Sequence, residues 1–284
     1  MSKIIDGKKI AQNIRMELKD EIKNLKEDGR APGLTVVMVG NNPASETYVS
    51  MKEKAAEEIG INSRLLKKDE DISEKELLDL IDELNNDPEV DGILVQLPLP
   101  EHIDEKKVIE SIVPDKDVDG FHPINTGRLF SGQEDSLRYE ACTPLGIIRM
   151  LEREGIEIDG KNATIVGRSN IVGKPIAHLL LERHATVTIC HSHTKDLKAE
   201  TKRADIVVAA VGRAEMITGD MIKEGAVVID VGINRIDGEL LGDVEFESAK
   251  EVASRITPVP GGVGPMTIAM LMENTVKARK YHGV

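Results

Sequence analysis

Short apolar runs rich in β-branched residues alternate along this chain with longer segments of helical periodicity. The apolar runs cover residues 34–40, 63–68, 92–98, 163–167, 186–190, 205–212 and 226–232. The alternation predicts βαβ units and mostly parallel sheets, because the crossover between parallel strands is usually a helix. The four later runs are almost continuously apolar, as expected of strands covered on both faces. The predicted fold class is therefore α/β.

The order of these runs predicts two α/β domains. A length of 284 residues suits two domains of ordinary size. The later series predicts a Rossmann-type, doubly wound parallel sheet over residues 141–264. The earlier series predicts a first domain over residues 1–140, and we expect the last helix, residues 265–284, to pack back onto it. Residues 117–146 form a turn-rich stretch without clear periodicity, which is often functional in compact proteins.

Composition excludes several classes of partner. The formal net charge is −13, and the sequence contains no run of clustered Lys and Arg. Binding to nucleic acid or to an anionic membrane is therefore not expected. The N-terminal segment is charged, reads as a strand followed by an amphipathic helix, and resembles no signal peptide. Cys142 and Cys190, the only cysteines, suggest packing residues in a reducing cytoplasm.

Tyr48 and Lys52 are spaced i, i+4 on a predicted helix, so their side chains share one face. Asn42 can cap this helix, Pro43 suits its first turn and Gly60 is a natural stop. The helix directly follows the run 34–40, which places its start at the carboxyl edge of a parallel sheet, where such folds bind ligands. The pair is either catalytic or a solvated surface pair, and spacing alone does not decide between them.

A glycine-containing turn follows the first strand of the second domain, in "VGRSNIVGKP". Backbone N–H groups and the helix dipole at such a turn form a site for a phosphate. Gly167 and Gly173 are present, but the G-x-G-x-x-G fingerprint is not, so an ordinary βα turn is the alternative.

The next strand, residues 186–190, is followed by "HSHT", without the carboxylate that usually binds the ribose of NAD. Ser192 and Arg168 can instead bind a 2′-phosphate, which favours NADP. His191 and His193 lack a third ligand, so no metal is predicted.

Three further stretches are unusual for structure alone. They are "VQLPLP" at 95–100, "PDKDVDG" at 114–120 and "TPVPGGVGPMT" at 257–267. Turn chemistry explains each one singly. Taken together with the preceding motifs, they resemble the bifunctional methylenetetrahydrofolate dehydrogenase/cyclohydrolase family of the FolD type. The resemblance spans essentially the whole chain, in order, through "VGNNPASETYVSMKEKA", "VQLPLP", "PDKDVDGF", "CTPLG", "VGRSNIVGKP", "HSHT", "DVGIN" and "TPVPGGVGPMT". It departs at Ala141, where the family usually has proline.

This resemblance implies two domains separated by a cleft, and a homodimer that associates through the nucleotide domains. It implies oxidation of 5,10-methylenetetrahydrofolate by NADP to the methenyl cation, which the same enzyme hydrolyses to 10-formyltetrahydrofolate. A role in one-carbon metabolism and purine biosynthesis follows. The partners expected are tetrahydrofolate derivatives, with neither nucleic acid nor membrane.

The resemblance also implies roles for individual residues. Tyr48 resembles the tyrosine that packs on the aminobenzoyl ring, Lys52 the catalytic lysine, Gln96 its partner and Asp119 the acid that binds the pterin. The matching motifs imply further substrate contacts at Ser45, Leu97, Pro98, Pro260, Gly261 and Gly262. They imply cofactor contacts at Thr143, Gly167, Arg168, Ser169, Val172, Ser192, Gly212, Ile233 and Thr267.

Physical chemistry agrees with these roles. A carboxylate such as Asp119 is a natural bidentate acceptor for the 2-amino group and ring N–H of a pterin. The chain has no Trp and only three Tyr, and Tyr48 alone lies near the predicted ligand edge. Lys52 acts either as a base or as a charged donor to the tetrahedral oxygen, and the sequence leaves both open.

Three alternatives bear on this interpretation. A monofunctional dehydrogenase of the same family would not need Lys52 and Gln96. A regulatory module would bind NADP without turnover. Short-chain dehydrogenases share the Tyr-x-x-x-Lys spacing but carry it inside the nucleotide domain, whereas here it precedes that domain.

Overall fold

The computed structural model describes residues 3–27, 29–132 and 139–283. The chain divides into two compact units. The three-stranded unit contains Asn13–Cys142 and Ile268–Val284, and the six-stranded unit contains Met1–Gln12 and Thr143–Thr267. No helix within the described ranges is long and apolar enough to span a membrane.

The three-stranded unit is built on a parallel sheet, as the alternating runs predict. Its strands lie in the order β3 (Asn62–Lys68), β2 (Gly33–Val39), β4 (Gly92–Val95). The central strand β2 is buried along its whole length, as expected when helices cover both faces. The helices of this unit are α1 (Gly7–Glu27), α2 (Pro43–Ile59), α3 (Glu74–Asn86), α4 (Glu105–Ser111), the 3-10 turn Pro114–Lys116, α5 (Pro123–Phe130) and α10 (Val263–His282).

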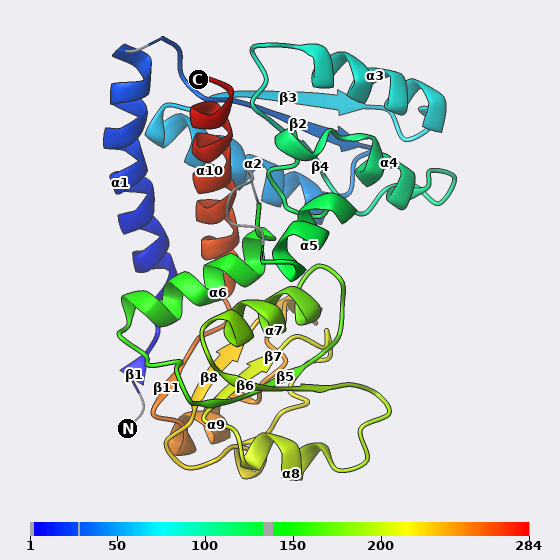
Figure 1. Cartoon of the computed structure of the whole chain (residues 1–284). Coiled ribbons are helices and arrows are strands. Elements are labelled where there is room, and N and C mark those ends of the chain that lie inside the picture. Colours follow the sequence, from blue (N-terminus) through cyan, green and yellow to red (C-terminus); the bar gives the residue numbers. More distant parts are fainter. Residues whose placement is uncertain (1–2, 28, 133–138, 284) are drawn as a thin grey trace. The chain divides into compact units, whose positions relative to one another are not determined.

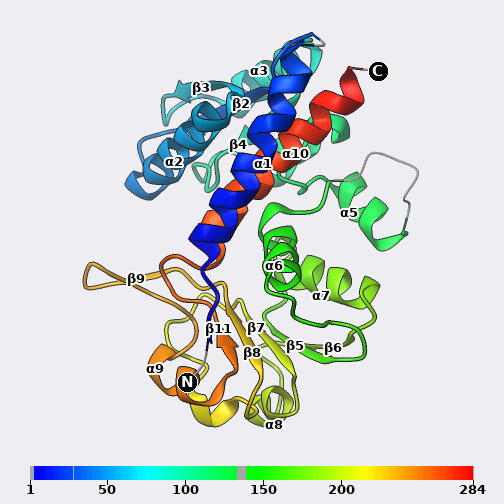
Figure 2. The same cartoon turned by 90° about the vertical axis from the view of Figure 1, so that its left-hand side faces the viewer.

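Two helices from opposite ends of the chain meet in this unit. α1 and α10 run side by side in Figures 1 and 2, and Lys280 of α10 forms an ion pair with Glu21 of α1. On another face of the sheet, α3 and α4 contribute Leu77, Ile81 and Val108 to a core that contains Val37 and Val95. The C-terminal helix is thus a structural part of the three-stranded unit.

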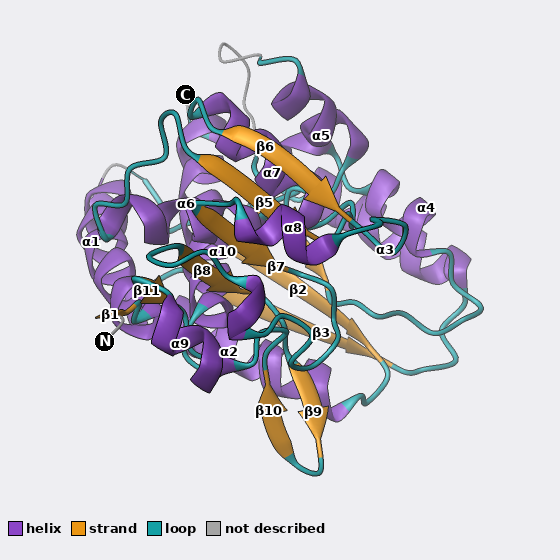
Figure 3. Ribbon diagram, turned by 90° about the horizontal axis from the view of Figure 1, so that it is seen from below, coloured by secondary structure: helices purple, strands orange, loops and turns teal. Residues whose placement is uncertain are grey.

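The six-stranded unit is all-parallel, with the strand order β1-β11-β8-β7-β5-β6 (Figure 3). Its elements are β1 (Lys3–Ile4), α6 (Cys142–Arg153), β5 (Asn162–Val166), α7 (Gly173–Glu182), β6 (Thr186–Cys190), α8 (Leu197–Lys202), β7 (Ile206–Ala209), the 3-10 turn Gly219–Met221, β8 (Val227–Asp230), β9 (Asn234–Ile236), β10 (Glu239–Leu241), α9 (Phe246–Val252) and β11 (Arg255–Ile256). Because β6 and β7 lie on opposite sides of β5, the strand order reverses there. Ligands of such sheets bind at the carboxyl ends of the strands near this reversal.

The N-terminal residues correct the predicted domain boundary. The prediction placed residues 1–140 in the first domain, but β1 pairs with β11 of the other sheet, with Lys3 opposite Arg255. The first residues therefore belong to the six-stranded unit. Backbone hydrogen bonds from Lys3 and Ile5 to Ser254 and Ile256 fix this pairing.

Two further elements differ from the prediction. The stretch 117–146, predicted to be irregular, contains α5, which begins at Pro123 with the His122 side chain as its cap. Residues 133–138 of that stretch lie outside the described residues. The antiparallel hairpin of β9 and β10 was not predicted and projects beside the main sheet (Figure 3).

Candidate active and cofactor sites

Helix α2 places Tyr48 and Lys52 on one face. The Asn42 side chain accepts the N–H of Ala44 at 2.9 Å, and Gly60 ends the helix with φ of 87°. Both end signals predicted from the sequence are confirmed. Lys52 is only 8% exposed, so the alternative of a solvated surface pair is wrong for the lysine. Tyr48 is half-buried, and this burial raises the pKa of its phenol, which keeps the ring neutral.

Lys52 contacts Gln96, which follows β4. The Lys52 Nζ donates to Gln96 Oε1 at 3.0 Å, and Gln96 Nε2 donates to the carbonyl of Leu97 at 2.8 Å. The second bond orients the amide so that its oxygen faces the lysine. The Gln96 backbone N–H is in turn held by the Val37 carbonyl at 2.8 Å. The sheet edge therefore fixes the partner that holds the lysine.

Asp119 lies close enough to this pair for its charge to interact with that of Lys52. Burial raises the pKa of Asp119, and the charge of Lys52 and a hydrogen bond from Cys142 oppose the rise. Burial also raises the pKa of the Cys142 thiol, so that it remains a donor. Three residues that are distant in sequence thus share one partly desolvated environment in the three-stranded unit.

The loop that carries Asp119 is anchored by a second carboxylate. Asp117 is 2% exposed and accepts N–H groups from Phe121, His122 and the Asn125 side chain at 3.2, 2.8 and 2.9 Å. Gly120 follows Asp119 with φ of 73°, and a Cβ there would lie 2.7 Å from Ala141 N. The loop is therefore held tightly on both sides of Asp119.

The remaining predicted substrate residues fall into two groups. Ser45 is buried in the first turns of α2, and Leu97 and Pro98 follow Gln96, joined by a cis peptide bond. These lie in the same unit as Lys52. Pro260, Gly261 and Gly262 belong to the six-stranded unit, where the Gly261 carbonyl accepts the Lys8 N–H at 3.0 Å. Their contact with substrate stays a prediction.

The turn between β5 and α7 is closely packed. A Cβ on Gly167 would lie 2.1 Å from the Ala210 carbonyl, and one on Gly173 would lie 2.4 Å from the Gly167 carbonyl. Ser169 Oγ accepts the N–H groups of Val172 and Gly173 at 3.2 Å each. Only glycine permits this approach of strand, turn and helix, and pyrophosphate binding at this turn stays a prediction. The helix that follows has ten residues.

The turn after β6 suits a phosphorylated ribose. Its backbone is closed by the His191 N–H, which donates to Thr194 Oγ1 at 2.9 Å, and Ser192 is exposed. Arg168, at the neighbouring strand end, is exposed as well. A hydroxyl and a guanidinium at these positions fit a 2′-phosphate better than a bare ribose. Elsewhere in this unit the predicted contacts Thr143 and Thr267 join through their hydroxyls at 2.8 Å.

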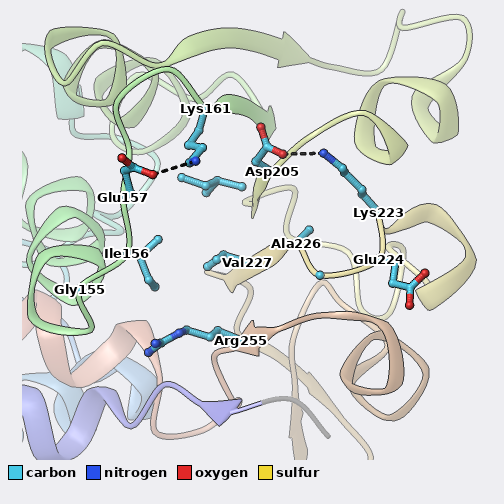
Figure 4. Close-up of a pocket in the computed structure, with 12 residues that line it drawn as sticks. Gly155, Ile156, Glu157, Lys161, Asp205, Lys223, Glu224, Ala226, Val227 and Arg255 are labelled. Atoms are coloured by element: carbon cyan, nitrogen blue, oxygen red, sulfur yellow. Dashed lines mark hydrogen bonds and ion pairs between the residues drawn. The ribbon is translucent and has the colours of Figure 1, made fainter.

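A separate cavity lies at the opposite, amino ends of β7 and β8 (Figure 4). Two ion pairs lie within its lining, Lys161 with Glu157 at 2.9 Å and Lys223 with Asp205 at 2.6 Å. Because the nucleotide of such a sheet binds at the carboxyl ends, this cavity is not the cofactor site. Within the described residues, no group of three or more His, Cys, Asp or Glu side chains is arranged to hold a metal ion.

A glycine turn on a parallel sheet with reversed strand order, together with a buried lysine bonded to an amide and within electrostatic reach of an acid, is typical of an α/β enzyme that uses a pyridine nucleotide. Comparison with known proteins is more specific. The chain belongs to the tetrahydrofolate dehydrogenase/cyclohydrolase family, whose catalytic domain matches residues 5–119 and whose NAD(P)-binding domain matches residues 141–283.

Individual relatives match over their full length. The chain is 70% identical to "Bifunctional protein FolD" of Halothermothrix orenii over 100% of both chains. A crystal structure of the FolD enzyme from Campylobacter jejuni is 51% identical, with a TM-score of 0.96 and 99% of each chain covered. The enzyme from Trypanosoma brucei, complexed with NADP and an inhibitor, is 38% identical with a TM-score of 0.93, covering 99% of this chain and 98% of its own.

Proposed function

We propose that this protein oxidises 5,10-methylenetetrahydrofolate with NADP and then hydrolyses the methenyl product to 10-formyltetrahydrofolate. Family membership over both domains supports the two activities. The structural observation that carries the proposal is the buried Lys52, bonded to Gln96 and within electrostatic reach of Asp119. A dehydrogenase without the hydrolytic step would have no need to desolvate this lysine.

Asp119 and Tyr48 bind and orient the folate in this proposal. The two oxygens of Asp119 accept the parallel donors of the pterin, which is the strongest geometry for a carboxylate. The neutral ring of Tyr48 offers its face to the aminobenzoyl group. Oxidation needs chiefly correct alignment of the one-carbon unit, and these two contacts supply it.

The six-stranded unit binds the cofactor. When bound there, NADP would supply the acceptor for the hydride that leaves the methylene carbon. The β5–α7 turn with Ser169 faces the pyrophosphate, and Arg168 and Ser192 bind the 2′-phosphate. This assignment rests on the close packing at Gly167 and on the absence of an acidic residue in 191–194 of the sequence.

Lys52 serves the hydrolytic step. Addition of water to the methenyl carbon creates a tetrahedral adduct, and its collapse opens the ring, gives the formyl group and releases one proton. The Nζ group already donates to Gln96 Oε1 and lies within electrostatic reach of Asp119. As a charged donor it stabilises the developing oxygen, and Gln96 holds it in position.

Replacement of the lysine tests the proposal. Lys52→Met keeps the volume of the stem and removes the donor, so hydrolysis of methenyltetrahydrofolate should fall by about 100-fold or more. Lys54→Met, an exposed site two residues along the same helix, should retain activity. Unchanged hydrolysis by purified Lys52→Met would refute the assignment. A wild-type protein that binds NADP without any turnover would instead support the regulatory module.

The cellular setting belongs to the same proposal. Both cysteines are free and buried, which suits a reducing cytoplasm.

The 10-formyl product supplies one-carbon units for purine biosynthesis. We propose a homodimer, because β6 is a sheet edge whose Ile189 is 40% exposed, and Leu181 at the end of the preceding helix α7 is 56% exposed. Light scattering of Ile189→Lys, compared with wild type, measures whether this edge holds two copies together.

A further inference from the structure

Asp243 is a buried carboxylate that has no part in the proposed chemistry. It is 0% exposed and lies between β10 and α9 of the six-stranded unit. Burial of a charged carboxylate is costly unless hydrogen bonds satisfy its oxygens. Its partners therefore indicate what the residue does.

The carboxylate of Asp243 accepts three backbone hydrogen bonds from the turn after β7. Its Oδ2 accepts the N–H groups of Val211 and Gly212 at 2.6 and 2.9 Å, and its Oδ1 accepts the Arg213 N–H at 2.9 Å. Successive backbone N–H groups form an anion-binding concavity. Here a side chain of the protein occupies that concavity, so the shape of the turn is set before any ligand arrives.

The same carboxylate also holds the loop after β8. Asn234 donates its Nδ2 to Asp243 Oδ1 at 3.0 Å, directly after the predicted cofactor contact Ile233. Gly212, the other predicted contact here, is itself one of the donors. Asp243 thus links the two loops that carry both residues.

A second buried carboxylate holds Asp243 in place. Asp230 accepts the backbone N–H groups of Asp243 and Gly232 at 2.9 Å each and that of Val244 at 3.0 Å. Two glycines leave room for these contacts. A Cβ on Gly242 would lie 1.8 Å from Asp230 Oδ2, and one on Gly232 would lie 2.3 Å from Asp243 Oδ1. The position of Asp243 is therefore strongly determined.

The sheet order places these loops relative to the cofactor. The pyrophosphate turn follows β5, and the 2′-phosphate residues follow β5 and β6. β7 and β8 lie on the other side of β5. A dinucleotide that runs along the carboxyl edge, with its adenosine half at β6, has its nicotinamide half at β7 and β8.

We propose that Asp243 is a positioning residue for the nicotinamide half of NADP: its carboxylate holds the Val211–Arg213 turn and the Ile233–Asn234 loop in the form that binds this half. The inference rests on the proposed function, because it concerns the same cofactor site. The inference predicts different effects on the binding of the two halves of the cofactor. Binding measurements alone can therefore test it.

Asp243→Asn is compared with Asp205→Asn as the matched control. Asp205 likewise accepts a backbone N–H, from Asn162 at 2.9 Å, but at the amino end of β7, beside the cavity of Figure 4. Calorimetry measures the affinity for NADP and for 2′,5′-ADP, which lacks the nicotinamide half. Hydrolysis of methenyltetrahydrofolate, measured without NADP, reports on the other unit.

Asp243→Asn should weaken NADP binding by about tenfold. One of the two carboxylate oxygens becomes an NH₂ donor, which would face the backbone N–H groups. Its affinity for 2′,5′-ADP and its hydrolytic kcat/KM should stay within about twofold of wild type, as should all three values for Asp205→Asn. Unchanged NADP affinity, or equal losses for both nucleotides, overturns the inference.

If Asp243→Asn fails to fold, Asn234→Ala decides, because it removes one donor and leaves the carboxylate. It should weaken NADP by about threefold and leave 2′,5′-ADP unchanged, and equal affinity for NADP would overturn the inference. If the wild-type protein binds NADP and catalyses the reaction while the variants keep wild-type NADP affinity, only the inference about Asp243 fails and the proposed function stands. A wild-type protein that binds no NADP overturns both.

Discussion

Asn274, in the middle of α10, donates its side-chain amide to the carbonyl oxygen of Val118 at 2.8 Å, across 156 residues of sequence. The same amide nitrogen lies 3.1 Å from the Glu140 carbonyl and 3.6 Å from Cys142 Sγ. Val118 directly precedes Asp119. The C-terminal helix therefore holds the backbone of the proposed pterin-binding loop, in addition to the hydrogen bonds of Asp117.

Asn274→Ala should loosen this loop. We expect the KM for the folate substrate to rise by about threefold to tenfold in both reactions, with unchanged NADP affinity, because two carbonyls lose their donor. The free energy of unfolding should fall by about 1–3 kcal/mol. Steady-state kinetics and urea denaturation measure both effects.

Asn85→Ala is a suitable control for that experiment. Asn85 bonds the Ser111 carbonyl at 2.8 Å and the Val113 N–H at 3.0 Å in the same unit. It should lower stability to a similar extent and leave the folate KM unchanged. A rise of KM in both variants would mean that general loosening, not the Asp119 loop, is responsible.

Arg168→Ala should weaken NADP far more than NAD. Only NADP carries the 2′-phosphate, and loss of a charge-assisted bond to it costs about 1.5–3 kcal/mol, or roughly tenfold to 100-fold in affinity. Titration with each nucleotide gives the ratio. Arg203→Ala removes another exposed positive charge from the same unit and should change the affinity for neither nucleotide. Equal losses for both nucleotides in Arg168→Ala would contradict the assignment.

The buried Asp117 should make stability depend on pH. Burial raises its pKa to about 7, although three donated hydrogen bonds favour its charged form. In the unfolded chain the group loses its proton near pH 4, so between pH 4 and 7 the folded state holds the extra proton. The contribution of this group to the free energy of unfolding therefore falls as pH rises through that window.

Asp117→Asn removes this titration. Relative to wild type, the variant should gain about 2 kcal/mol in free energy of unfolding between pH 5 and pH 7, at up to about 1.4 kcal/mol per pH unit. Urea denaturation at several pH values in this range measures the difference. If the free energy of unfolding changed with pH in the same way in both proteins, Asp117 would be charged in the folded state across this pH range.

Gly242→Ala should disrupt the six-stranded unit. The added Cβ would lie 1.8 Å from Asp230 Oδ2, so the buried carboxylate must move from its three N–H partners. A loss of about 3 kcal/mol or more is expected. Gly127→Ala is the control, because a Cβ there has nothing within 4 Å and lies in α5, where alanine favours the helix. Thermal unfolding distinguishes the two, and equal melting temperatures would contradict the prediction.

Much of the fold was predictable because most of its strands are short, largely apolar runs between helical segments. Runs such as 186–190 coincide with β6, and the run 34–40 lies within one residue of β2. The run 92–98 was longer than β4, which ends at Val95, because Gln96 leaves the strand to meet Lys52. The missed hairpin carried its own signal in Asp237 and Gly238, both of which adopt positive φ, as a two-residue hairpin turn requires.

The site was predictable only in part. Periodicity placed Tyr48 and Lys52 on one face, whereas the partners Gln96 and Asp119 came from the resemblance to a family. Asn274 and Asp243 gave no local sign, because an asparagine in an apolar helix and an aspartate after a strand have many structural uses. Their roles depend on contacts with Val118 and Val211, which only the folded chain brings to them.

The pairing of β1 with β11 has a consequence for synthesis on the ribosome. Lys3 and Ile4 leave the exit tunnel long before their partners Arg255 and Ile256, which follow much later in the chain. The six-stranded sheet therefore cannot complete its strand pairing until Ile256 has emerged, whereas β2, β3 and β4, which lie between Gly33 and Val95, can pair much earlier.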